Sequence, residues 1–273
     1  MLDSRNILLV GCGKMGGAML RGWLARGIDS ADVRVVEPFD AAAEALRSEL
    51  SVPVVSAATD LDRSFAPDIV VFAVKPQGMD DIVPSYAGRL IADAVVLSIA
   101  AGRNIGFFEK HLGRDVAIVR TMPNTPAAVG RGITAACAND GVSADQRSVC
   151  QSLLEAIGEV VWVEDESLID PVTAVSGSGP AYVFLMIECL ARAGKAQGLP
   201  PDTAEKLARA TVAGSGERAR VSDESAETLR VNVTSPGGTT AAALEVLMEE
   251  EGLGRLMDRA VDAATRRSRE LAG

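Results

Sequence analysis

Several residues that carry chemistry are scarce in this sequence of 273 residues. It has one histidine, four cysteines and only 4% aromatic residues. A single His111 and scattered cysteines with no C-x-x-C pair give little support for a metal site, so we expect no bound metal and free thiols. The sequence has no Ser-His-Asp set, and His111 is expected to be solvated on a surface helix, so general acid–base catalysis by histidine is not expected. The low aromatic content argues against a surface that stacks nucleic-acid bases.

Excess positive charge and long apolar runs are lacking as well. Lys and Arg number 27 against 37 Asp and Glu, a net charge of −10, which disfavours nucleic acid and anionic membranes as partners. No uninterrupted apolar run reaches the ~18 residues of a membrane span. The chain enters an apolar strand almost at once, so we expect no signal peptide. With 48% hydrophobic residues, the sequence predicts a globular, cytoplasmic protein with sizeable cores.

What the sequence does contain is an alternation of strand and helix patterns up to residue 163. This alternation predicts an α/β fold with a Rossmann-type, doubly wound parallel sheet as a dinucleotide-binding domain over 1–163. Strand patterns then cease, and 164–273 reads as an all-helical domain. The expected strands cover 7–10, 33–36, 52–55, 69–74, 95–99 and 116–119, with edge strands at 133–137 and 160–163. The expected C-terminal helices cover 167–176, 180–197, 201–221, 225–232, 237–250 and 253–270.

The glycine-rich stretch Gly11–Gly16 follows the first apolar strand and opens a helix pattern. A G-x-G-x-x-G stretch in this context predicts a dinucleotide site, with the pyrophosphate at the helix start, although a purely structural glycine turn stays possible. Glu37 ends the second strand, 21 residues after Gly16. A carboxylate there would bond ribose hydroxyls and repel a 2′-phosphate, which favours NAD over NADP; a surface glutamate before a turn is the alternative.

Four further loops could carry chemistry, and each could also be purely structural. Three of them follow predicted strands, where open α/β sheets bind ligands. These are the Lys75-Pro76 turn, the small-residue loop at 98–102 and the rigid Pro-flanked loop at 122–126. The fourth, at 234–240, lies between helices. Its hydroxyls and free N–H groups could hold a carboxylate.

These motifs occur in the order seen in the pyrroline-5-carboxylate reductase family, which the sequence resembles over essentially its whole length. The resemblance implies reduction of 1-pyrroline-5-carboxylate, a cyclic imino acid, to L-proline by NADPH or NADH, the last step of proline biosynthesis. It also implies a helical dimerisation domain, a homodimer and, in many members, a decamer. The motifs are Gly11–Met15, Ala73–Pro76, Ser98–Gly102, Met122–Pro126, Val175–Tyr182 and Val233–Thr240.

The resemblance also implies roles for individual residues. The cofactor-binding set is Val10, Gly11, Cys12, Gly13, Lys14, Met15, Ala73, Val74, Lys75, Pro76, Ile99, Ala100, Ala101 and Asn232, to which the ribose argument adds Glu37. The substrate-binding set is Met122, Val233, Gly237, Gly238, Thr239 and Thr240. Thr240 is the main catalytic candidate, because its hydroxyl would face the ring nitrogen. Asp223, which occupies the place of a glutamate sometimes given a catalytic role, is the second.

This sequence departs from the family pattern near the second catalytic candidate. Ser225-Ala226 stand where the family usually has His-Pro, and Val231 replaces the usual Asp. These departures put local hydrogen bonding in doubt, though not the fold. Two other functions also stay open. One is a different imine reductase or a β-hydroxyacid reductase of the same fold, although neither Lys195 nor Lys206 sits in the lysine motif of the hydroxyacid enzymes. The other is a protein that binds a dinucleotide as a sensor without catalysis.

Overall fold

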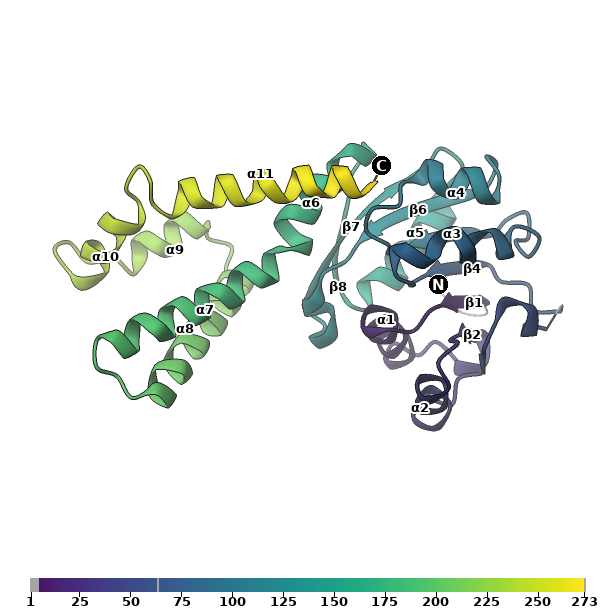
Figure 1. Cartoon of the computed structure of the whole chain (residues 1–273), viewed down its shortest axis with the longest axis horizontal. Helices are drawn as coiled ribbons and strands as arrows, with labels where there is room; N and C mark the ends of the chain where they lie inside the picture. Colours follow the sequence, from purple (N-terminus) through teal and green to yellow (C-terminus); the bar gives the residue numbers. More distant parts are fainter. Residues whose placement is uncertain (1–4, 63, 273) are drawn as a thin grey trace. The chain divides into compact units, whose positions relative to one another are not determined.

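The protein is described by a computed structural model, which covers residues 5–62 and 64–272; the ends of the two predicted domains, at 1–4 and 273, lie outside the described residues. Its chain divides into two compact units (Figure 1). The first runs as far as Gly177 and also contains the chain from Ala264 on, and the second is Ser178–Ala263. The predicted boundary after residue 163 follows the last strand. The units divide later because the next helical turns, including the fully buried Ile169, pack on the sheet.

The first unit is built on one eight-stranded sheet in the order β3-β2-β1-β4-β5-β6-β7-β8. Every neighbouring pair is parallel except β6 and β7. The predicted parallel, doubly wound sheet is therefore confirmed for β1 to β6, and the β6–β7 pair departs from it. The reason is the short connection through the 3₁₀ turn Thr125–Val129, since a parallel crossover needs a dozen or more residues. The strands are β1 (Ile7–Val10), β2 (Val33–Val36), β3 (Val54–Val55), β4 (Ile69–Phe72), β5 (Val95–Ser98), β6 (Ala117–Met122), β7 (Gly132–Ala138) and β8 (Gly158–Trp162).

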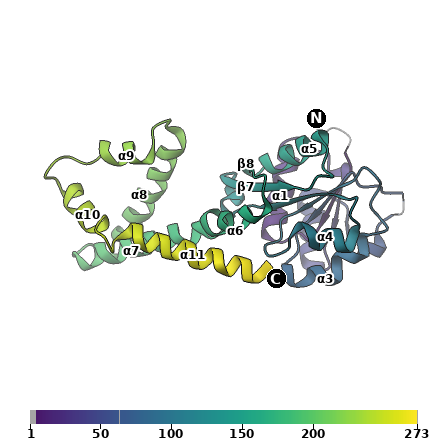
Figure 2. The ribbon, with the colours of Figure 1, turned by 90° about the horizontal axis from the view of Figure 1, so that it is seen from above.

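Helices cover both faces of this sheet (Figure 2). The two faces carry separate apolar cores, because successive side chains of a strand point to opposite sides. On one face lie α1 (Lys14–Ala25), α2 (Asp40–Leu50) and α5 (Ala144–Glu155). The buried Trp23 of α1 donates its indole N–H to the carbonyl of Leu153 at 2.9 Å and so ties α1 to α5. On the other face lie α3 (Met79–Ile82), α4 (Ile105–Leu112) and α6 (Ile169–Val172).

The last helix, α11 (Leu253–Ala272), returns the chain to the first unit. Ser268 Oγ donates to Asp170 Oδ1 at 2.7 Å. Gly102, at φ +71°, lies so close that a Cβ there would stand 2.9 Å from the Leu271 carbonyl oxygen. The end of α11 is therefore part of the first unit, and it lies against the small-residue loop at 98–102.

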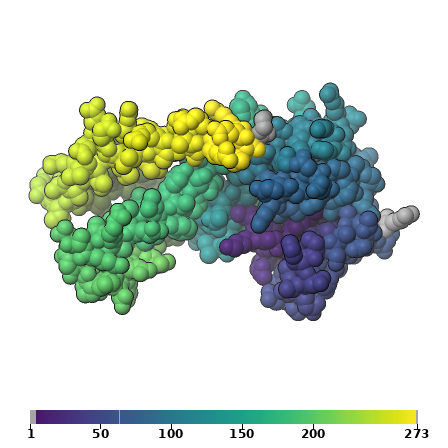
Figure 3. All heavy atoms as spheres, viewed as in Figure 1, coloured from purple at the N-terminus to yellow at the C-terminus, as the bar shows by residue number. Residues whose placement is uncertain are grey.

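The second unit contains the long helices α7 (Gly179–Ala196) and α8 (Pro201–Val221), followed by α9 (Ala226–Asn232), α10 (Thr239–Leu247) and the first turns of α11. The long pair packs closely through alanines, with Ala191, Ala204 and Ala208 buried. The atoms of this unit are drawn from green to yellow in Figure 3. The predicted helices are confirmed here, except that the one expected at 237–250 begins at Thr239 and ends at Leu247. Large apolar side chains on α7 stay exposed; Phe184 is 59% exposed.

By length and composition alone, the helical segment Glu166–Ala196 could cross a membrane. Its 18-residue window has a mean hydropathy of 1.4, and 11% of that window is buried. No membrane span was expected because the sequence has no uninterrupted apolar run of this length, but this segment is long and apolar enough without being uninterrupted. The same features describe a helix that a partner subunit covers.

Candidate active site

The glycine turn at the end of β1 has the geometry that a dinucleotide pyrophosphate requires. Gly11 adopts φ +83°, and a Cβ there would stand 2.5 Å from Val74 Cγ1. Gly13 is the N-cap of α1, which has no side-chain cap and no acidic residue in its first turn. The N–H groups at the start of α1 are thus not hydrogen-bonded to a carboxylate of their own helix. A helix start of this kind suits an anion, so the residues present fit a bound dinucleotide.

The next loop predicted to contact the cofactor packs directly on this turn. A Cβ on Gly16 would stand 2.7 Å from the Gly11 carbonyl oxygen and 3.1 Å from Ala73 Cβ. The Ala73 N–H donates to the Val10 carbonyl at 2.8 Å. The structure therefore brings 10–16 and 73–76 together at the carboxyl ends of β1 and β4, which are neighbours in the sheet.

Glu37 lies at the end of β2, but its side chain is not a free surface group. It is only 5% exposed, and its carboxylate accepts the N–H of Cys12 at 2.9 Å and the N–H of Phe39 at 3.2 Å. The negative charge is thus held against the glycine turn. The alternative of a solvated surface glutamate is excluded by this burial, while the ribose contact stays a prediction.

Cys12 is part of the same cluster. Its partly buried thiol has a pKa raised to about 11, first by burial and then by the nearby Glu37 carboxylate, with Arg21 acting in the opposite direction. The thiol is therefore protonated at neutral pH and is a weak nucleophile. The four cysteines are free, as the sequence predicts.

Two more predicted loops lie at the ends of β5 and β6. The Ile99 N–H donates to the Phe72 carbonyl at 3.1 Å, which joins the small-residue loop to the end of β4. The buried Met122 ends β6, and Asn124 follows it. Asn124 accepts the Ile133 N–H at 3.0 Å and donates to the Ser176 carbonyl at 3.3 Å. These bonds make the Pro-flanked loop rigid, as expected, and give its asparagine a bracing role that the sequence reasoning did not assign.

An ion pair between a buried arginine and a partly exposed glutamate was missed by the sequence reasoning. Arg120 of β6 is 3% exposed, and its Nη1 donates to Glu166 Oε1 at 2.8 Å. Glu166 Oε1 also accepts the Ile105 N–H at the start of α4, at 2.7 Å. The pair joins β6, α4 and the turn that leads into α6. An arginine inside an apolar strand pattern was the signal that could have revealed it.

The substrate residues predicted in the helical unit gather where α10 begins. Gly237 adopts φ +65°, and Gly238 is the N-cap of α10 with no side-chain cap. The first turn of α10, which starts with Thr239 and Thr240, contains no acidic residue. An uncapped helix start of this kind suits an anion, and the carboxylate contact stays a prediction. The helix begins two residues later than expected because the glycines stay outside it.

The remaining predicted residues of this unit lie around α9. Asn232 ends α9 and donates to Glu224 Oε1 at 3.0 Å. Ser225, which stands in place of the usual histidine, caps α9 by accepting the Thr228 N–H at 3.1 Å. Asp223 lies exposed in the turn before α9. The predicted cofactor residues, apart from Asn232, and Met122 thus belong to the first compact unit, while the other substrate residues and both catalytic candidates belong to the second.

The sheet order from β3 to β6 and the glycine turn define a dinucleotide-binding fold of the Rossmann type. The family matches make the protein an NAD(P)-dependent oxidoreductase. Residues 166–271 match the family model described as pyrroline-5-carboxylate reductase dimerisation, and residues 6–102 match the model described as NADP oxidoreductase, coenzyme F420-dependent. The chain belongs to the pyrroline-5-carboxylate reductase family, since its relatives in that family align with it from end to end. The pyrroline-5-carboxylate reductase of Pseudomonas aeruginosa is 37% identical over 271 residues, which cover 99% of this chain and 98% of that one. The one of Synechocystis is 42% identical over 261 residues, or 94% and 96% of the two chains.

Solved structures of the same family share the fold. A pyrroline-5-carboxylate reductase from Coxiella burnetii superposes with a TM-score of 0.92 at 36% identity, covering 99% of this chain and all of the other. The Plasmodium falciparum pyrroline carboxylate reductase, solved with NADP bound, gives a TM-score of 0.82 at 29% identity, with 99% of each chain covered. These comparisons confirm the predicted family, the Rossmann-type unit followed by a helical unit, and the class of cofactor.

Proposed function

We propose that this protein reduces 1-pyrroline-5-carboxylate to L-proline with a hydride from NADH or NADPH. One observation carries the proposal. A single chain joins a glycine turn suited to a dinucleotide with a Gly-Gly-Thr-Thr helix start suited to a small carboxylate, and it aligns end to end with pyrroline-5-carboxylate reductases. The other readings of the sequence explain only the first of these features.

In this proposal the first unit holds the cofactor. The glycine turn, Val10 to Met15, binds the pyrophosphate, and the turns Ala73–Pro76 and Ile99–Ala101 border the nicotinamide, with Asn232 of the other unit also near the cofactor. The reduced nicotinamide supplies the hydride when it is bound. The packing of Gly11 against Val74 supports a single continuous cofactor surface across the first two of these segments.

The second unit holds and orients the imino acid. The backbone N–H groups at the start of α10 accept the carboxylate, and Gly237, Gly238, Thr239 and Val233 shape the pocket together with Met122. Thr240 Oγ faces the ring nitrogen. A cyclic imine accepts hydride best once its nitrogen is protonated, and that protonation can occur in water before binding. Orientation and a hydrogen bond to nitrogen then suffice, which is consistent with a site built without histidine. Asp223 is the second candidate for a role at that nitrogen.

The test is direct. Incubation of the purified protein with 1-pyrroline-5-carboxylate and NADH or NADPH should oxidise the cofactor and produce L-proline in equal amounts. Oxidation with a different cyclic imine or a β-hydroxyacid partner, but not with this imino acid, would favour the rival reductases. Tight cofactor binding without turnover of any of these would favour the sensor.

The buried Glu37 favours the use of NADH over NADPH. Its carboxylate is fixed by two backbone N–H groups beside the glycine turn, where the adenosine ribose of a bound dinucleotide lies. A 2′-phosphate there would meet a negative charge that has little freedom to turn away. We therefore propose that the protein uses NADH at least as well as NADPH, although an NADP-bound relative is known.

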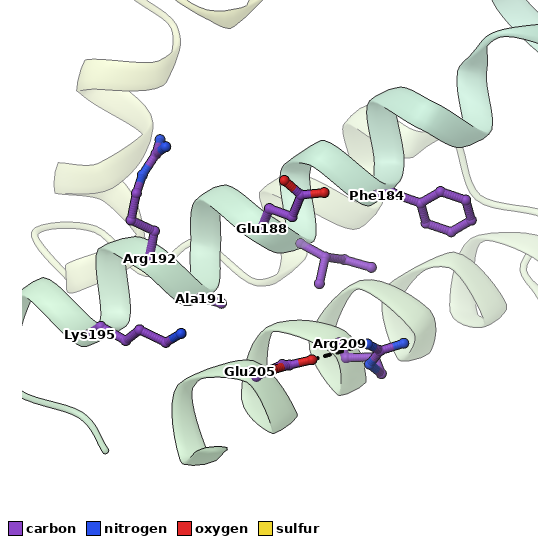
Figure 4. A pocket seen from close by; sticks show the side chains of 8 residues that line it. Phe184, Glu188, Ala191, Arg192, Lys195, Glu205 and Arg209 are labelled. Atoms are coloured by element: carbon purple, nitrogen blue, oxygen red, sulfur yellow. Dashed lines mark hydrogen bonds and ion pairs between the residues drawn. The ribbon is translucent and has the colours of Figure 1, made fainter. Parts of the chain in front are cut away.

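The exposed face of the helical unit supports a homodimer. α7 and α8 border a hollow of about 540 Å³ lined by Phe184, Ile187 and charged side chains (Figure 4). On its α8 side, Arg209 and Glu205, one helical turn apart, are paired at 3.2 Å. Exposed apolar side chains beside such a hollow are typical of a surface that another subunit covers. The homodimer, its further assembly into a decamer and a cytoplasmic location complete the proposal.

A further inference from the structure

We propose that Arg103 is a positioning residue that holds the Val74–Pro76 turn in place under the nicotinamide. The inference rests on the proposed function, because it takes this turn as a border of the cofactor. Arg103 follows the loop at 98–102, and nothing in the motif analysis singled it out.

The contacts of Arg103 join two of the predicted cofactor loops. Its Nε and Nη2 donate to the Pro76 carbonyl oxygen at 3.3 and 3.1 Å. Nη2 also donates to Asp80 Oδ2 in α3. The guanidinium carbon lies 4.6 Å from the centre of the Phe107 ring. A guanidinium that donates two hydrogen bonds to one carbonyl oxygen while it stacks on a ring is fixed in both position and plane.

The Val74–Pro76 turn, to which Arg103 donates, packs at its other end on the glycine turn. Val74 fills the space left by the missing side chain of Gly11, and Ala73 bonds to Val10. Pro76 begins a short 3₁₀ turn in which the Met79 N–H also donates to the Pro76 carbonyl, and the Gly78 N–H donates to the Lys75 carbonyl at 3.0 Å. The Arg103 bonds therefore fix the distal end of the turn, where Lys75 is exposed.

The base from which Arg103 extends is itself fixed. Gly102 lies against the Leu271 carbonyl of α11, so closely that a side chain at this position would clash. Asn104 caps α4 by accepting the Phe107 N–H at 2.8 Å. Arg103 is three-quarters buried, with 25% of its side chain exposed, whereas Asp80 is mostly exposed. The bonds to Pro76 are thus shielded from water more than the ion pair to Asp80 is, and we assign the positioning role to the former.

Three variants separate the two contacts. Arg103→Met removes both, Arg103→Lys keeps the charge but lacks the fork that chelates one oxygen, and Asp80→Asn removes only the ion pair. Arg147→Met is the matched control. Arg147 also stacks on an aromatic ring, 4.1 Å from the centre of Trp162, and faces Glu164 at 3.8 Å, but it touches none of the predicted site residues.

The first readout needs neither cofactor nor substrate. Hydrogen exchange of the full-length protein should be faster at the Gly78 and Met79 amides in Arg103→Met, and unchanged there in Asp80→Asn and Arg147→Met. The second readout is the fluorescence of bound NADH. Its anisotropy and intensity should fall in Arg103→Met at saturating protein, while the cofactor Kd changes less than about threefold, because the pyrophosphate contacts remain.

The third readout is turnover. In Arg103→Met, kcat should fall about ten- to a hundredfold as the ring loses its orientation, and the isotope effect from deuterated NADH should rise because hydride transfer becomes slower. Arg103→Lys should be intermediate, and the other two variants should stay within about threefold of the starting protein.

The inference is overturned if Arg103→Met exchanges and turns over like the starting protein, or if Asp80→Asn is impaired as much as Arg103→Met. Absence of any turnover of 1-pyrroline-5-carboxylate by the unaltered protein would overturn the proposed function instead. In that case the exchange and NADH-fluorescence readouts would still decide the role of Arg103.

Discussion

Glu37 shows how a single residue can act on the cofactor in two ways. Its carboxylate accepts the Cys12 N–H and so braces the glycine turn. In the proposed function, its charge also repels the 2′-phosphate of NADPH. The two effects can be separated. Loss of the brace affects NADH and NADPH alike, whereas loss of the charge changes only their ratio.

We therefore expect Glu37→Ser to shift the ratio of kcat/KM for NADPH to that for NADH upward by about tenfold or more, because one close charge–charge repulsion disappears. Steady-state kinetics with each cofactor measures it. Glu44→Ser is the control, since Glu44 is a carboxylate on the exposed side of α2, paired there with Arg47. An unchanged ratio in Glu37→Ser, or a strong NADPH preference in the unaltered protein, would contradict the proposed role.

Thr240 is the residue on which the proposed chemistry depends most. Thr240→Ala should lower kcat by about ten- to a hundredfold while leaving the Kd for NADH within about twofold, since the lost hydroxyl serves the imino acid and not the cofactor. Thr240→Ser keeps the hydroxyl and should recover most of the activity. Rapid-reaction measurement of hydride transfer tests both variants, and wild-type rates in Thr240→Ala would remove Thr240 from the mechanism.

Cys12 should be a slow thiol despite its place in the glycine turn. Its pKa of about 11 lies two units above the ordinary value of 9.0, so at about pH 8 its alkylation should be about a hundredfold slower than that of a free cysteine. The rate should keep rising beyond pH 9. The free energy of unfolding depends on this thiol as well. Above the unfolded pKa of 9.0 the unfolded chain loses the thiol proton while the folded chain keeps it, so the free energy of unfolding falls as the pH rises toward about 11. Mass spectrometry of the Cys12 peptide measures the rate; rapid labelling at neutral pH would refute the burial.

At the scale of elements, the contact of α1 with the end of α5 depends on a missing side chain. A Cβ on Gly22 would stand 2.6 Å from the Ala156 carbonyl oxygen, next to the bond from Trp23 to Leu153. Gly22→Ala should therefore cost about 1–3 kcal/mol of unfolding free energy although alanine favours helices. Gly106→Ala in α4 meets only an ordinary contact at 3.7 Å and should raise stability by up to about 1 kcal/mol. Urea unfolding of both variants tests the pair, and equal effects would contradict the close approach.

Most elements could be predicted from the sequence because their patterns are local. Apolar β-forming runs located the eight strands, and Gly11–Gly16 after a strand pattern located the glycine turn that opens α1. The antiparallel direction of β7 was not predicted. It depends on the short connection through Thr125–Val129, and the sequence of this connection resembles an ordinary turn. The Arg120–Glu166 pair and the grip of Arg103 on Pro76 join residues 46 and 27 positions apart. Such contacts cannot be predicted from the periodicity of the sequence, because they form only when the strands come together in the sheet.

At the scale of the whole molecule, the helical unit presents a surface that a single chain does not bury. Small residues such as Ala191 and Ala208 fill the contact between α7 and α8, while larger apolar side chains such as Phe184 remain outside it. Burial of an apolar side chain of that size contributes about 1.5–3 kcal/mol, so a face of several such residues is a substantial source of association energy. The proposed homodimer accounts for the exposure.

The prediction that follows is a change of mass in solution. Phe184→Glu should weaken the dimer by about a hundredfold or more, since the new carboxylate would be buried at the contact without a partner. Sedimentation velocity over a range of concentrations measures this. Ile91→Glu is the control, because Ile91 is an exposed aliphatic residue of the nucleotide-binding unit, outside the dimerisation segment. If Phe184→Glu sediments as the unaltered protein does, the α7 face is not the dimer contact, and a different surface must cover it; if the unaltered protein is a monomer at every concentration, the exposed face has another purpose and the homodimer is wrong.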